Sequence, residues 1–249
     1  MTREDYEARL AAVRNLPGGS SEHHRTYVGP VAQYDFMGAT QFRLLTGLGL
    51  REDHRLMDLG CGSLRAGRFL IQYLLPGRYV GVEPNSWLWQ AALADEIGED
   101  ILRLKEPLFL SDPDVTSAAI GGPVDFVVAQ SIYSHTGKDL FLRSLKRLAK
   151  VINPGGQLLF TVVSPEEQKK KVPPGERATG WIYPGVVTFK EESVLKFCQR
   201  FGFTAQRLPW FHPRQTWYRA TLDGSMLDET QIQAMGTGRP LFDDRFDAS

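Results

Sequence analysis

The sequence is short of the residues on which several classes of protein depend. Its 249 residues include only two cysteines, Cys61 and Cys198, and these have no companion spacing that indicates a metal site. It contains no run of 18 apolar residues, so no membrane-spanning helix is expected. Lysine plus arginine and aspartate plus glutamate number 29 each, and the net charge is therefore zero. The electrostatic signature of proteins that bind nucleic acid or anionic membranes is lacking.

The start of the chain also lacks a secretion signal, because residues 1–5, MTRED, do not open one. The few cysteines are consistent with a reducing compartment, and together these features predict a cytoplasmic protein. We assign no metal ligands. A chain of this length can bury a large core, either as one α/β domain or as a domain with an added cap.

The most informative stretch is 55–85, RLMDLGCGSLRAGRFLIQYLLPGRYVGVEPN. Its pattern predicts a strand over 56–59, a glycine turn, a helix within 65–75 and a second strand over 79–82. A strand, a helix and a strand of this length form a parallel βαβ unit with a right-handed crossover. Ligands of such sheets bind at the carboxyl ends of the strands.

Three residues of this stretch indicate a ligand that contains a nucleoside. Gly60 and Gly62 remove side chains where the chain turns, so a ligand can approach the backbone N–H groups at the start of the helix. Glu83 follows the second strand, about 20 residues after the turn, where an acid can bind a ribose diol. The pyrophosphate-binding pattern G-x-G-x-x-G is incomplete because Arg65 stands at its last position. A nucleoside without phosphates is therefore favoured over NAD.

The segments DLGCG (58–62) and VGVEP (80–84) resemble motifs I and II of the class I S-adenosylmethionine-dependent methyltransferases. Leu64 stands where the first motif of that family has its third glycine. The resemblance implies S-adenosylmethionine as the cofactor, with Asp58 bracing the turn. The residues that it places around the cofactor are Asp58, Gly60, Cys61, Gly62, Glu83 and Pro84. Arg65 is a further candidate, for the cofactor's carboxylate, which no family motif assigns.

The resemblance also implies a fold. This is a Rossmann-like, doubly wound α/β fold with a seven-stranded sheet in the order 3-2-1-4-5-7-6, the last strand antiparallel, over residues 51–221. Beyond the first two strands, the sequence predicts strands over 101–104 or 107–110, then 124–130, 157–163, 203–208 and 215–221. Helices are predicted over 87–97, 139–152 and 189–201.

Two further strand ends supply candidate cofactor ligands. The family often has an acid after the third strand that accepts a hydrogen bond from the adenine amino group. Asp112 is the best-placed candidate, with Asp114 and Glu106 as alternatives. The end of the fourth predicted strand resembles motif IV of the family, which implies that Gln130 and Ser131 lie beside the transferring methyl group.

The candidate catalytic residues, His135 and Tyr133, follow the same strand. A neutral imidazole near pH 7 suits a general base that takes a proton from an acceptor hydroxyl. The alternative is a histidine that binds the backbone and shapes the loop. The ring of Tyr133 either orients the acceptor or the sulfonium or belongs to the core. Thr136, with Asp139 three residues later, has the pattern of a capping box.

Residues 1–50 are predicted to form an N-terminal helical cap. In class I methyltransferases this segment commonly covers the cofactor and helps to form the acceptor pocket, which makes Tyr27 and Tyr34 candidate substrate-binding residues. The alternative is that these aromatic rings only pack the cap against the sheet.

Two later segments are further candidates for the acceptor side. Residues 164–187 are irregular and rich in charge and proline, as in a lid-like loop, and Trp181 is expected to fold back over the acceptor. His212 lies in the connection of the last two strands and is either an acceptor contact or a turn residue. The C-terminal tail, 222–249, is predicted to be peripheral or partly disordered.

We therefore expect methyl transfer to a small or medium-sized acceptor, most simply a hydroxyl, by in-line displacement with His135 as the base. The same motifs would serve a non-methyl reaction of S-adenosylmethionine, such as cyclisation or another alkyl transfer, or methylation of nitrogen or carbon. A non-catalytic cofactor-binding partner in a larger assembly is a third possibility. Neutral charge predicts a small-molecule partner rather than nucleic acid or a membrane, and the sequence does not indicate an oligomeric state.

Overall fold

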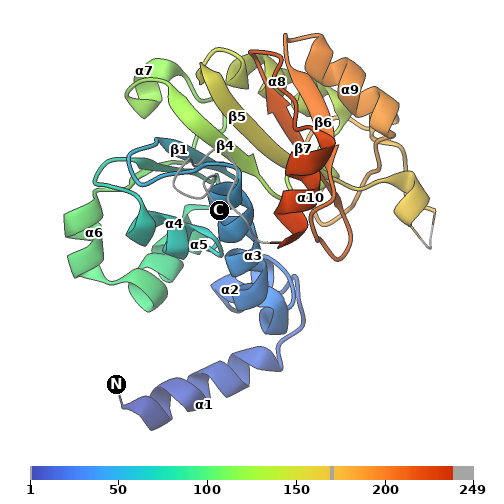
Figure 1. Ribbon diagram of the computed structural model, residues 1–249. Coiled ribbons are helices and arrows are strands. Elements are labelled where there is room, and N and C mark those ends of the chain that lie inside the picture. Colours follow the sequence, from blue (N-terminus) through green and yellow to red (C-terminus); the bar gives the residue numbers. More distant parts are fainter. Residues whose placement is uncertain (1, 169–170, 238–249) are drawn as a thin grey trace.

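A computed structural model describes residues 2–168 and 171–237 of the chain. It contains a seven-stranded sheet with helices on both faces (Figure 1). The strand order is β3-β2-β1-β4-β5-β7-β6, and β7 runs antiparallel to both of its neighbours while the other pairs are parallel. The predicted fold class, strand order and antiparallel last strand are confirmed.

The strands lie close to their predicted positions. They are β1 (Leu56–Leu59), β2 (Tyr79–Val82), β3 (Leu108–Leu110), β4 (Val124–Ala129), β5 (Ile152–Val162), β6 (Thr204–Leu208) and β7 (Thr216–Thr221). Of the two positions predicted for the third strand, the second is right, because 101–104 belongs to a helix. β5 begins five residues earlier than predicted, since Ile152 pairs with Val124 ahead of a shift in register.

The helices connect these strands and precede the first of them. They are α1 (Arg3–Arg14), α2 (His24–Tyr27), α3 (Tyr34–Gly47), α4 (Gly67–Tyr73), α5 (Ser86–Ala92), α6 (Glu99–Lys105), α7 (Ser117–Ile120), α8 (Lys138–Leu148), α9 (Glu191–Gln199) and α10 (Glu229–Thr237). A π-helical turn, Leu93–Ile97, continues α5. Short 3-10 turns lie at 31–33, 133–135, 165–167 and 175–177.

Each face of the sheet has its own buried cluster. Helices α8 and α9 cover one face, where Phe141 and Phe197 pack against the strands. Helices α3 and α4 cover the other face, where Leu44 and Leu48 share a cluster with Leu70 (Figure 1). The predicted boundary between cap and core, at residue 50, therefore falls within one packed cluster.

The predicted capping box of Thr136 and Asp139 is not formed. Helix α8 begins after Gly137 without a side-chain cap. The Thr136 hydroxyl donates to the carbonyl oxygen of Tyr133, at 3.4 Å. The Asp139 carboxylate instead accepts from the N–H of Gly180, at 2.9 and 3.1 Å. This acid therefore fastens the segment 164–187 to the start of α8.

Part of the predicted tail is not peripheral. Leu227 and Met235 are 4% and 6% exposed and belong to the cluster beside α3. Met235 lies in α10, which the spacing of apolar residues only weakly indicates, whereas the backbone of Leu227 is hydrogen-bonded to the Gln206 side chain at 2.9 Å. Residues 238–249 of the tail and 169–170 of the predicted lid lie outside the described residues.

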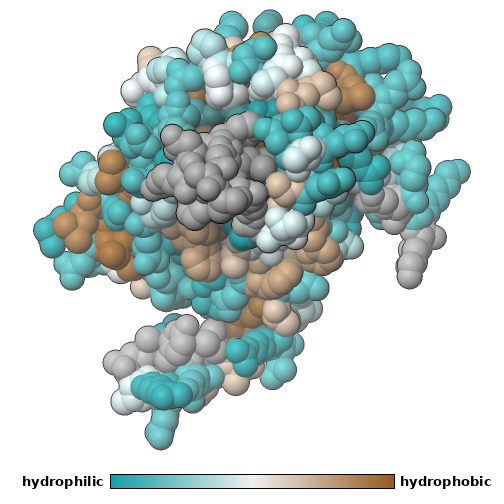
Figure 2. All heavy atoms as spheres, in the orientation of Figure 1, coloured by the Kyte–Doolittle hydropathy of each residue, from teal (hydrophilic) through white to brown (hydrophobic). Residues whose placement is uncertain are grey.

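The surface carries few large hydrophobic side chains. The face in Figure 2 is mainly hydrophilic, and a distinct brown area lies over α6, where Leu104 is 55% exposed. In the described part of the chain, no helix is both long and apolar enough to cross a membrane.

Candidate functional site

The carboxyl ends of β1 and β2 bring the glycine turn and its acid together. Gly60 and Gly62 have φ angles of +74° and +52°, a backbone conformation that favours glycine. Glu83 is 8% exposed, and its carboxylate accepts hydrogen bonds from the N–H groups of Gly62, at 3.2 Å, and Asn85, at 2.8 Å. Burial raises the pKa of Glu83, and these two hydrogen bonds oppose the rise. A buried carboxylate thus lies against the turn.

Leu64, which stands at the position of the family's third glycine, keeps a glycine-like backbone. Its φ is +57° and its side chain is fully buried. A left-handed conformation costs a residue with a side chain about 1–2 kcal/mol. Leu64 packs in the cluster beside α3 and α4, and burial of a leucine contributes about 1.5–3 kcal/mol. The burial offsets the strain.

Asp58 lies in the interior beside the turn and not at its surface. Its Oδ2 accepts a hydrogen bond from the Tyr79 hydroxyl at 2.9 Å. Burial raises the pKa of Asp58 to about 7, and that hydrogen bond limits the rise. Cys61 is also buried, its Sγ lies close to Gly81 of β2, and burial raises the pKa of its thiol. Both side chains hold the turn against β2.

The end of β4 carries a buried amide that has no hydrogen-bond partner. Gln130 is 7% exposed, and neither Nε2 nor Oε1 is paired within the part of the chain that the structure describes. Asp58 and Val128 are partners in β1 and β4, so Gln130 and Gly60 follow adjacent strand ends. A buried unpaired polar group costs about 1–3 kcal/mol. A ligand or an ordered water commonly completes such a group.

Ser131 is held by two residues that sequence reasoning did not single out. Its φ is +63°, its N–H donates to Thr161 Oγ1 at 2.8 Å, and its Oγ accepts from Gln215 Nε2 at 2.9 Å. The Thr161 hydroxyl donates to Gln215 Oε1 at 2.6 Å. Gln215 is 84 residues from Ser131 along the chain, so no local sequence pattern signals this network.

His135 has a defined tautomer. Its Nδ1 lies 2.7 Å from the carbonyl oxygen of Gly185. Because a carbonyl oxygen only accepts, Nδ1 carries the proton and Nε2 keeps a lone pair. Burial lowers the pKa of His135, and the hydrogen bond to Gly185 opposes the change. The imidazole is therefore neutral near pH 7, with its basic nitrogen at Nε2.

Tyr133 lies in the core. It is 1% exposed, its ring stacks on Phe141 at 4.0 Å between centroids, and its hydroxyl is hydrogen-bonded to Ser144 of α8 at 2.8 Å. Burial raises its pKa. The hydroxyl is thus engaged with α8, and the structure does not bring it to His135.

Aromatic side chains from the cap and from 164–187 meet beside His135. Tyr27 contacts Tyr183 and Trp87, with ring centroids 5.3 and 5.7 Å apart. Tyr183 and Trp181 contact His135 at 5.0 and 5.8 Å. We call these five residues the aromatic cluster. It brings together three of the predicted site residues: Tyr27, His135 and Trp181.

Backbone hydrogen bonds hold the segment 164–187 in this place. The N–H of Ile182 donates to the carbonyl oxygen of His135, and that of Val187 to the carbonyl oxygen of Ser134, both at 2.9 Å. The lid-like role of the segment stays a prediction.

Tyr34 supports the glycine turn from the cap side. It is 1% exposed, and its hydroxyl donates to the carbonyl oxygen of Ser63 at 2.5 Å. The guanidinium groups of Arg25 and Arg68 lie 4.7 and 5.0 Å from its ring centroid. Burial raises its pKa to about 12. This side chain packs the cap onto the turn.

Arg65 connects the turn with the segment between α2 and α3. Its Nη1 donates to the carbonyl oxygen of Val28 at 3.0 Å. Its Nε is buried and, among the described residues, has no hydrogen-bond partner. The Val28 side chain lies 2.9 Å from where a Cβ on Gly62 would stand. The cap therefore lies directly on the glycine turn.

The acids after β3 differ in their surroundings. Asp112 is exposed, and its Oδ1 accepts from the N–H of Asp114 at 2.8 Å. Asp114 forms ion pairs with Arg143 and, at 2.8 Å, Arg147. Glu106 ends α6 with a left-handed backbone. Asp112 remains the candidate among these acids. Pro84 is exposed next to Glu83.

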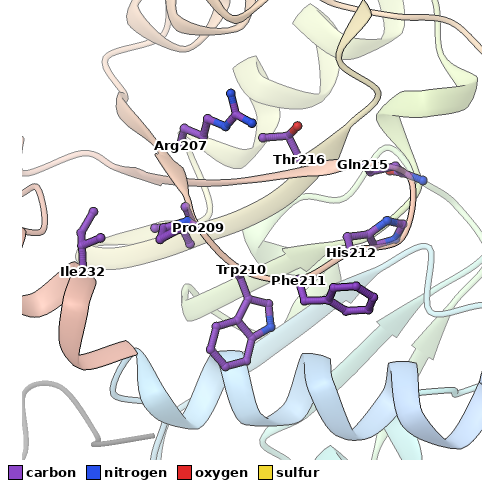
Figure 3. Close-up of a pocket in the computed structure, with 9 residues that line it drawn as sticks. Arg207, Pro209, Trp210, Phe211, His212, Gln215, Thr216 and Ile232 are labelled. Atoms are coloured by element: carbon purple, nitrogen blue, oxygen red, sulfur yellow. The ribbon is translucent and has the colours of Figure 1, made fainter. Parts of the chain in front are cut away.

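The connection between β6 and β7 borders a hollow of about 660 Å³. Figure 3 shows Trp210 pointing from this connection toward α3, where its Nε1 donates to the carbonyl oxygen of Thr40 at 3.2 Å. Gln215 lines the hollow and also binds Ser131, so the hollow adjoins the end of β4. Its lining residues are Arg207, Leu208, Pro209, Trp210, Phe211, His212, Gln215, Thr216 and Ile232.

His212 is an uncharged member of this wall. Burial lowers its pKa to about 3, and the charges of Arg65 and Arg214 add to the effect. Its Nδ1 accepts from the N–H of Arg214 at 3.2 Å.

Comparison with solved structures identifies the fold. No protein-family profile matches the sequence, and no curated protein matches it significantly. A complex of DhpI with S-adenosylhomocysteine has a TM-score of 0.57 at 16% identity, over 88% of this chain and 98% of that one. Magnesium protoporphyrin IX methyltransferase (ChlM) from Synechocystis PCC 6803, with bound S-adenosylmethionine, has a TM-score of 0.54 at 16% identity, over 88% and 90%.

A third solved structure agrees with these two. An S-adenosylmethionine-dependent methyltransferase from Clostridium acetobutylicum ATCC 824 has a TM-score of 0.57 at 14% identity, over 78% of this chain and 94% of that one. The chain therefore has the fold of the class I S-adenosylmethionine-dependent methyltransferases.

Proposed function

We propose that the protein transfers a methyl group from S-adenosylmethionine to a small or medium-sized acceptor, most simply a hydroxyl. The observation that carries the proposal is the buried carboxylate of Glu83, which lies at the end of β2 against the N–H of Gly62. An acid at this place in a doubly wound sheet binds a ribose diol. The fold adds support, because similar structures were solved with S-adenosylhomocysteine or S-adenosylmethionine bound.

The unpaired polar atoms of Gln130 can be compared with the groups that this cofactor carries. Its buried amide offers one unpaired acceptor and an unpaired donor group in the described structure, and the methionine end of the cofactor carries both an ammonium and a carboxylate. The unpartnered Nε of Arg65 offers a charge-assisted hydrogen bond to that carboxylate. The donor set fits the group. We assign Glu83 to the ribose, Gln130 and Arg65 to the methionine end, and Asp112 to the adenine amino group.

His135 is the proposed general base. The sulfonium of the cofactor supplies a methyl group that is already activated, so the protein has to align the acceptor atom and remove its proton. The hydrogen bond from Nδ1 to Gly185 fixes the ring and leaves Nε2 free to take a proton. The lowered pKa keeps this nitrogen unprotonated near pH 7. Both features support a hydroxyl as the acceptor.

We place the acceptor between the aromatic cluster and the end of β4. Tyr27 and Trp181 supply apolar walls beside His135, while Ser131 and Gln215 supply polar groups from the other side. A mainly apolar pocket with a few fixed polar groups is typical of a small-molecule site. In this proposal Tyr34 and Tyr133 only support the pocket, through the turn and the core.

The first experiment is calorimetric titration of the protein with S-adenosylmethionine, followed by mass analysis after incubation without an acceptor. Binding with the cofactor left intact is expected, and a search among hydroxylated metabolites would follow. Consumption of the cofactor to a product other than S-adenosylhomocysteine would favour a non-methyl reaction. No binding at millimolar cofactor would overturn the assignment of Glu83 and Gln130.

A further inference from the structure

A second cluster of polar side chains lies where the cap meets the π-helical turn Leu93–Ile97. The His24 Nε2 atom is 3.3 Å from Asp95 Oδ2, and the His23 Nε2 atom is 4.0 Å from the same oxygen. One ligand atom from each of these three residues lies within 4.8 Å of the other two. None of the three has a role in the function proposed above.

His24 is the most unusual member of this cluster. Its side chain is 2% exposed, yet neither ring nitrogen has a hydrogen-bond partner in residues 2–168 and 171–237. Buried polar groups are nearly always paired, and each exception calls for an explanation such as a missing ion. The Nε2 atom of His24 is near enough to Asp95 for an ion pair, at 3.3 Å, but does not form a hydrogen bond with it.

We propose that His23, His24 and Asp95 bind a zinc ion. Two imidazoles and a carboxylate are ligands that zinc takes in tetrahedral sites, with bonds of about 2.0–2.2 Å. Such bonds place neighbouring ligand atoms roughly 3.3–3.5 Å apart. The His24 and Asp95 atoms already have this separation, at 3.3 Å, while the His23 atom, at 4.0 Å from the same oxygen, has to move closer.

The surroundings of the cluster allow an ion to enter. The Asp95 side chain is 40% exposed, so an ion can arrive from the solvent and water can take the fourth position. Glu96 is the other acid close to His24, with Oε1 4.0 Å from Nε2. It is held by Arg25, at 2.5 Å, and by Arg68, at 3.4 Å, so we do not include it among the ligands.

Ligation changes the tautomer of His23. Its Nδ1 accepts a hydrogen bond from the N–H of Arg25 at 3.1 Å. If Nε2 binds zinc, Nδ1 must carry the proton, and this hydrogen bond at the start of α2 is lost. A single helix cap contributes little in comparison with three protein ligands bound to a zinc ion. The ion therefore outweighs the cap.

A bound ion would join two separate parts of the structure. His23 and His24 belong to the start of α2 in the cap, whereas Asp95 belongs to the π-helical turn after α5. Such turns occur frequently at functional sites. The proposal does not depend on the cofactor assignment, because its ligands are not among the residues assigned to S-adenosylmethionine.

The test uses the full chain, stripped of metal with a chelator and titrated with zinc chloride in a calorimeter. A parallel titration with cobalt(II) reports tetrahedral ligation through visible absorption. Binding of one zinc ion per chain is expected in the unsubstituted protein. Asp95→Asn and His24→Gln are each expected to weaken binding at least tenfold and to remove the cobalt absorption.

Two matched variants serve as controls. Asp100→Asn removes the same charge from a side chain that is 90% exposed, and His54→Gln removes a histidine that accepts a hydrogen bond from the N–H of Arg51 instead. Both are expected to bind zinc as the unsubstituted protein does. Circular dichroism of the metal-free variants shows whether they fold, and Asp95→Asn, at an exposed side chain, keeps the test valid if His24→Gln unfolds. Absence of binding, or equal binding by Asp95→Asn and Asp100→Asn, would overturn the proposal.

Discussion

The Tyr183 hydroxyl donates a hydrogen bond to the backbone carbonyl oxygen of Tyr27, 3.2 Å away, and joins two segments that are 156 residues apart. The two rings are also in contact. This pair directly connects the cap with the segment 164–187 beside the proposed acceptor site. Each segment therefore limits the motion of the other.

Tyr183→Phe is expected to loosen the cap near Tyr27. Loss of one hydrogen bond of this kind is worth about 0.5–1.5 kcal/mol, so local opening should become roughly 2–10 times more frequent. Hydrogen exchange of the backbone N–H groups in 19–29 measures this. Tyr73→Phe removes a hydroxyl that donates to Leu50 at 3.2 Å and should leave exchange in 19–29 unchanged. Equal exchange in Tyr183→Phe and the unsubstituted protein would contradict the prediction.

Gln130→Leu is expected to stabilise the protein while weakening cofactor binding. It removes the unpaired polar atoms of a buried amide, which should raise the free energy of unfolding by about 1 kcal/mol. The affinity for S-adenosylmethionine should fall by about tenfold, the equivalent of one lost hydrogen bond. Urea denaturation and calorimetry give the two values.

A second buried glutamine provides the control for that variant. Gln157 is 8% exposed, but its Oε1 accepts from Arg219 at 2.6 Å and its Nε2 donates to Leu48 at 2.9 Å. Gln157→Leu is therefore expected to destabilise the fold. The explanation fails if both substitutions destabilise to the same extent.

Glu83→Gln should weaken binding of S-adenosylmethionine by about 10–100-fold. The substitution keeps the shape of the side chain but removes the charge, and a hydrogen bond to a charged group contributes about 1.5–3 kcal/mol. Calorimetry measures the change. Glu192→Gln, at a side chain that is 75% exposed and pairs with Lys196, should bind the cofactor normally. An unchanged affinity in Glu83→Gln would remove this residue from the cofactor site.

At Leu64 glycine should be tolerated better than alanine. Both substitutions lose the burial of leucine, at a cost of about 2–5 kcal/mol. Glycine adopts a φ of +57° without the steric cost that alanine has. Leu64→Gly should therefore be about 1 kcal/mol more stable than Leu64→Ala. Leu70 is equally buried but lies within α4, where glycine should be about 1 kcal/mol worse than alanine. Urea denaturation of the four variants tests whether the order reverses between the two positions.

Stability should fall in acid through His212. Burial and the charges of Arg65 and Arg214 lower the pKa of His212 to about 3 in the folded protein, against about 6.5 in an unfolded chain. Below pH 6.5 the unfolded chain takes up a proton that the folded protein does not. The free energy of unfolding therefore falls, by about 1–2 kcal/mol between pH 6.5 and pH 5.

Comparison of His212→Gln with the unsubstituted protein isolates this contribution. Asp58 acts in the opposite direction, because its folded pKa of about 7 lets the folded protein take up a proton first. Both proteins contain Asp58, so its contribution cancels. Relative to the unsubstituted protein, the variant should gain about 1–2 kcal/mol on going from pH 7.5 to pH 5. Urea denaturation at the two pH values measures this gain. If the free energies of unfolding of the variant and the unsubstituted protein differ by the same amount at both pH values, the lowered pKa of His212 is contradicted.

The parts of the site that sequence analysis located are those made within one βαβ unit. The glycine turn and Glu83 are only 21 residues apart, and the pattern of two short strands around a helix places them at the same edge of the sheet. The order of the seven strands came from the family resemblance, since pairing between distant strands leaves no local pattern. That resemblance also pointed to Gln130, although its unpaired amide became visible only in the structure.

The remaining contacts could not be predicted because their partners are far apart in the chain. Nothing near Ser131 indicates that Gln215 binds it, and nothing near Asp139 indicates that it accepts from Gly180 instead of capping α8. The position of Tyr133 after β4 suggests a site residue. In the structure its ring instead packs in the core against apolar residues of α8 and β5. Where the local sequence allowed two positions for a side chain, packing against distant segments determined which one it takes.

Gln215 donates a hydrogen bond to Ser131 and accepts one from Thr161. These two bonds join the β6–β7 connection directly to the end of β4. The residues proposed for the cofactor follow β2, β3 and β4 or lie in the turn after β1, whereas the walls proposed for the acceptor also come from the cap, the segment 164–187 and the β6–β7 connection. The two sides of the proposed pocket therefore draw largely on different segments of the chain and meet at the end of β4. Exchange of residues 209–214 alone, with Gln215 kept, would change the lining of the hollow and keep the hydrogen bonds at the end of β4. A protein with this layout can change the acceptor proposed for it by small replacements in its loops.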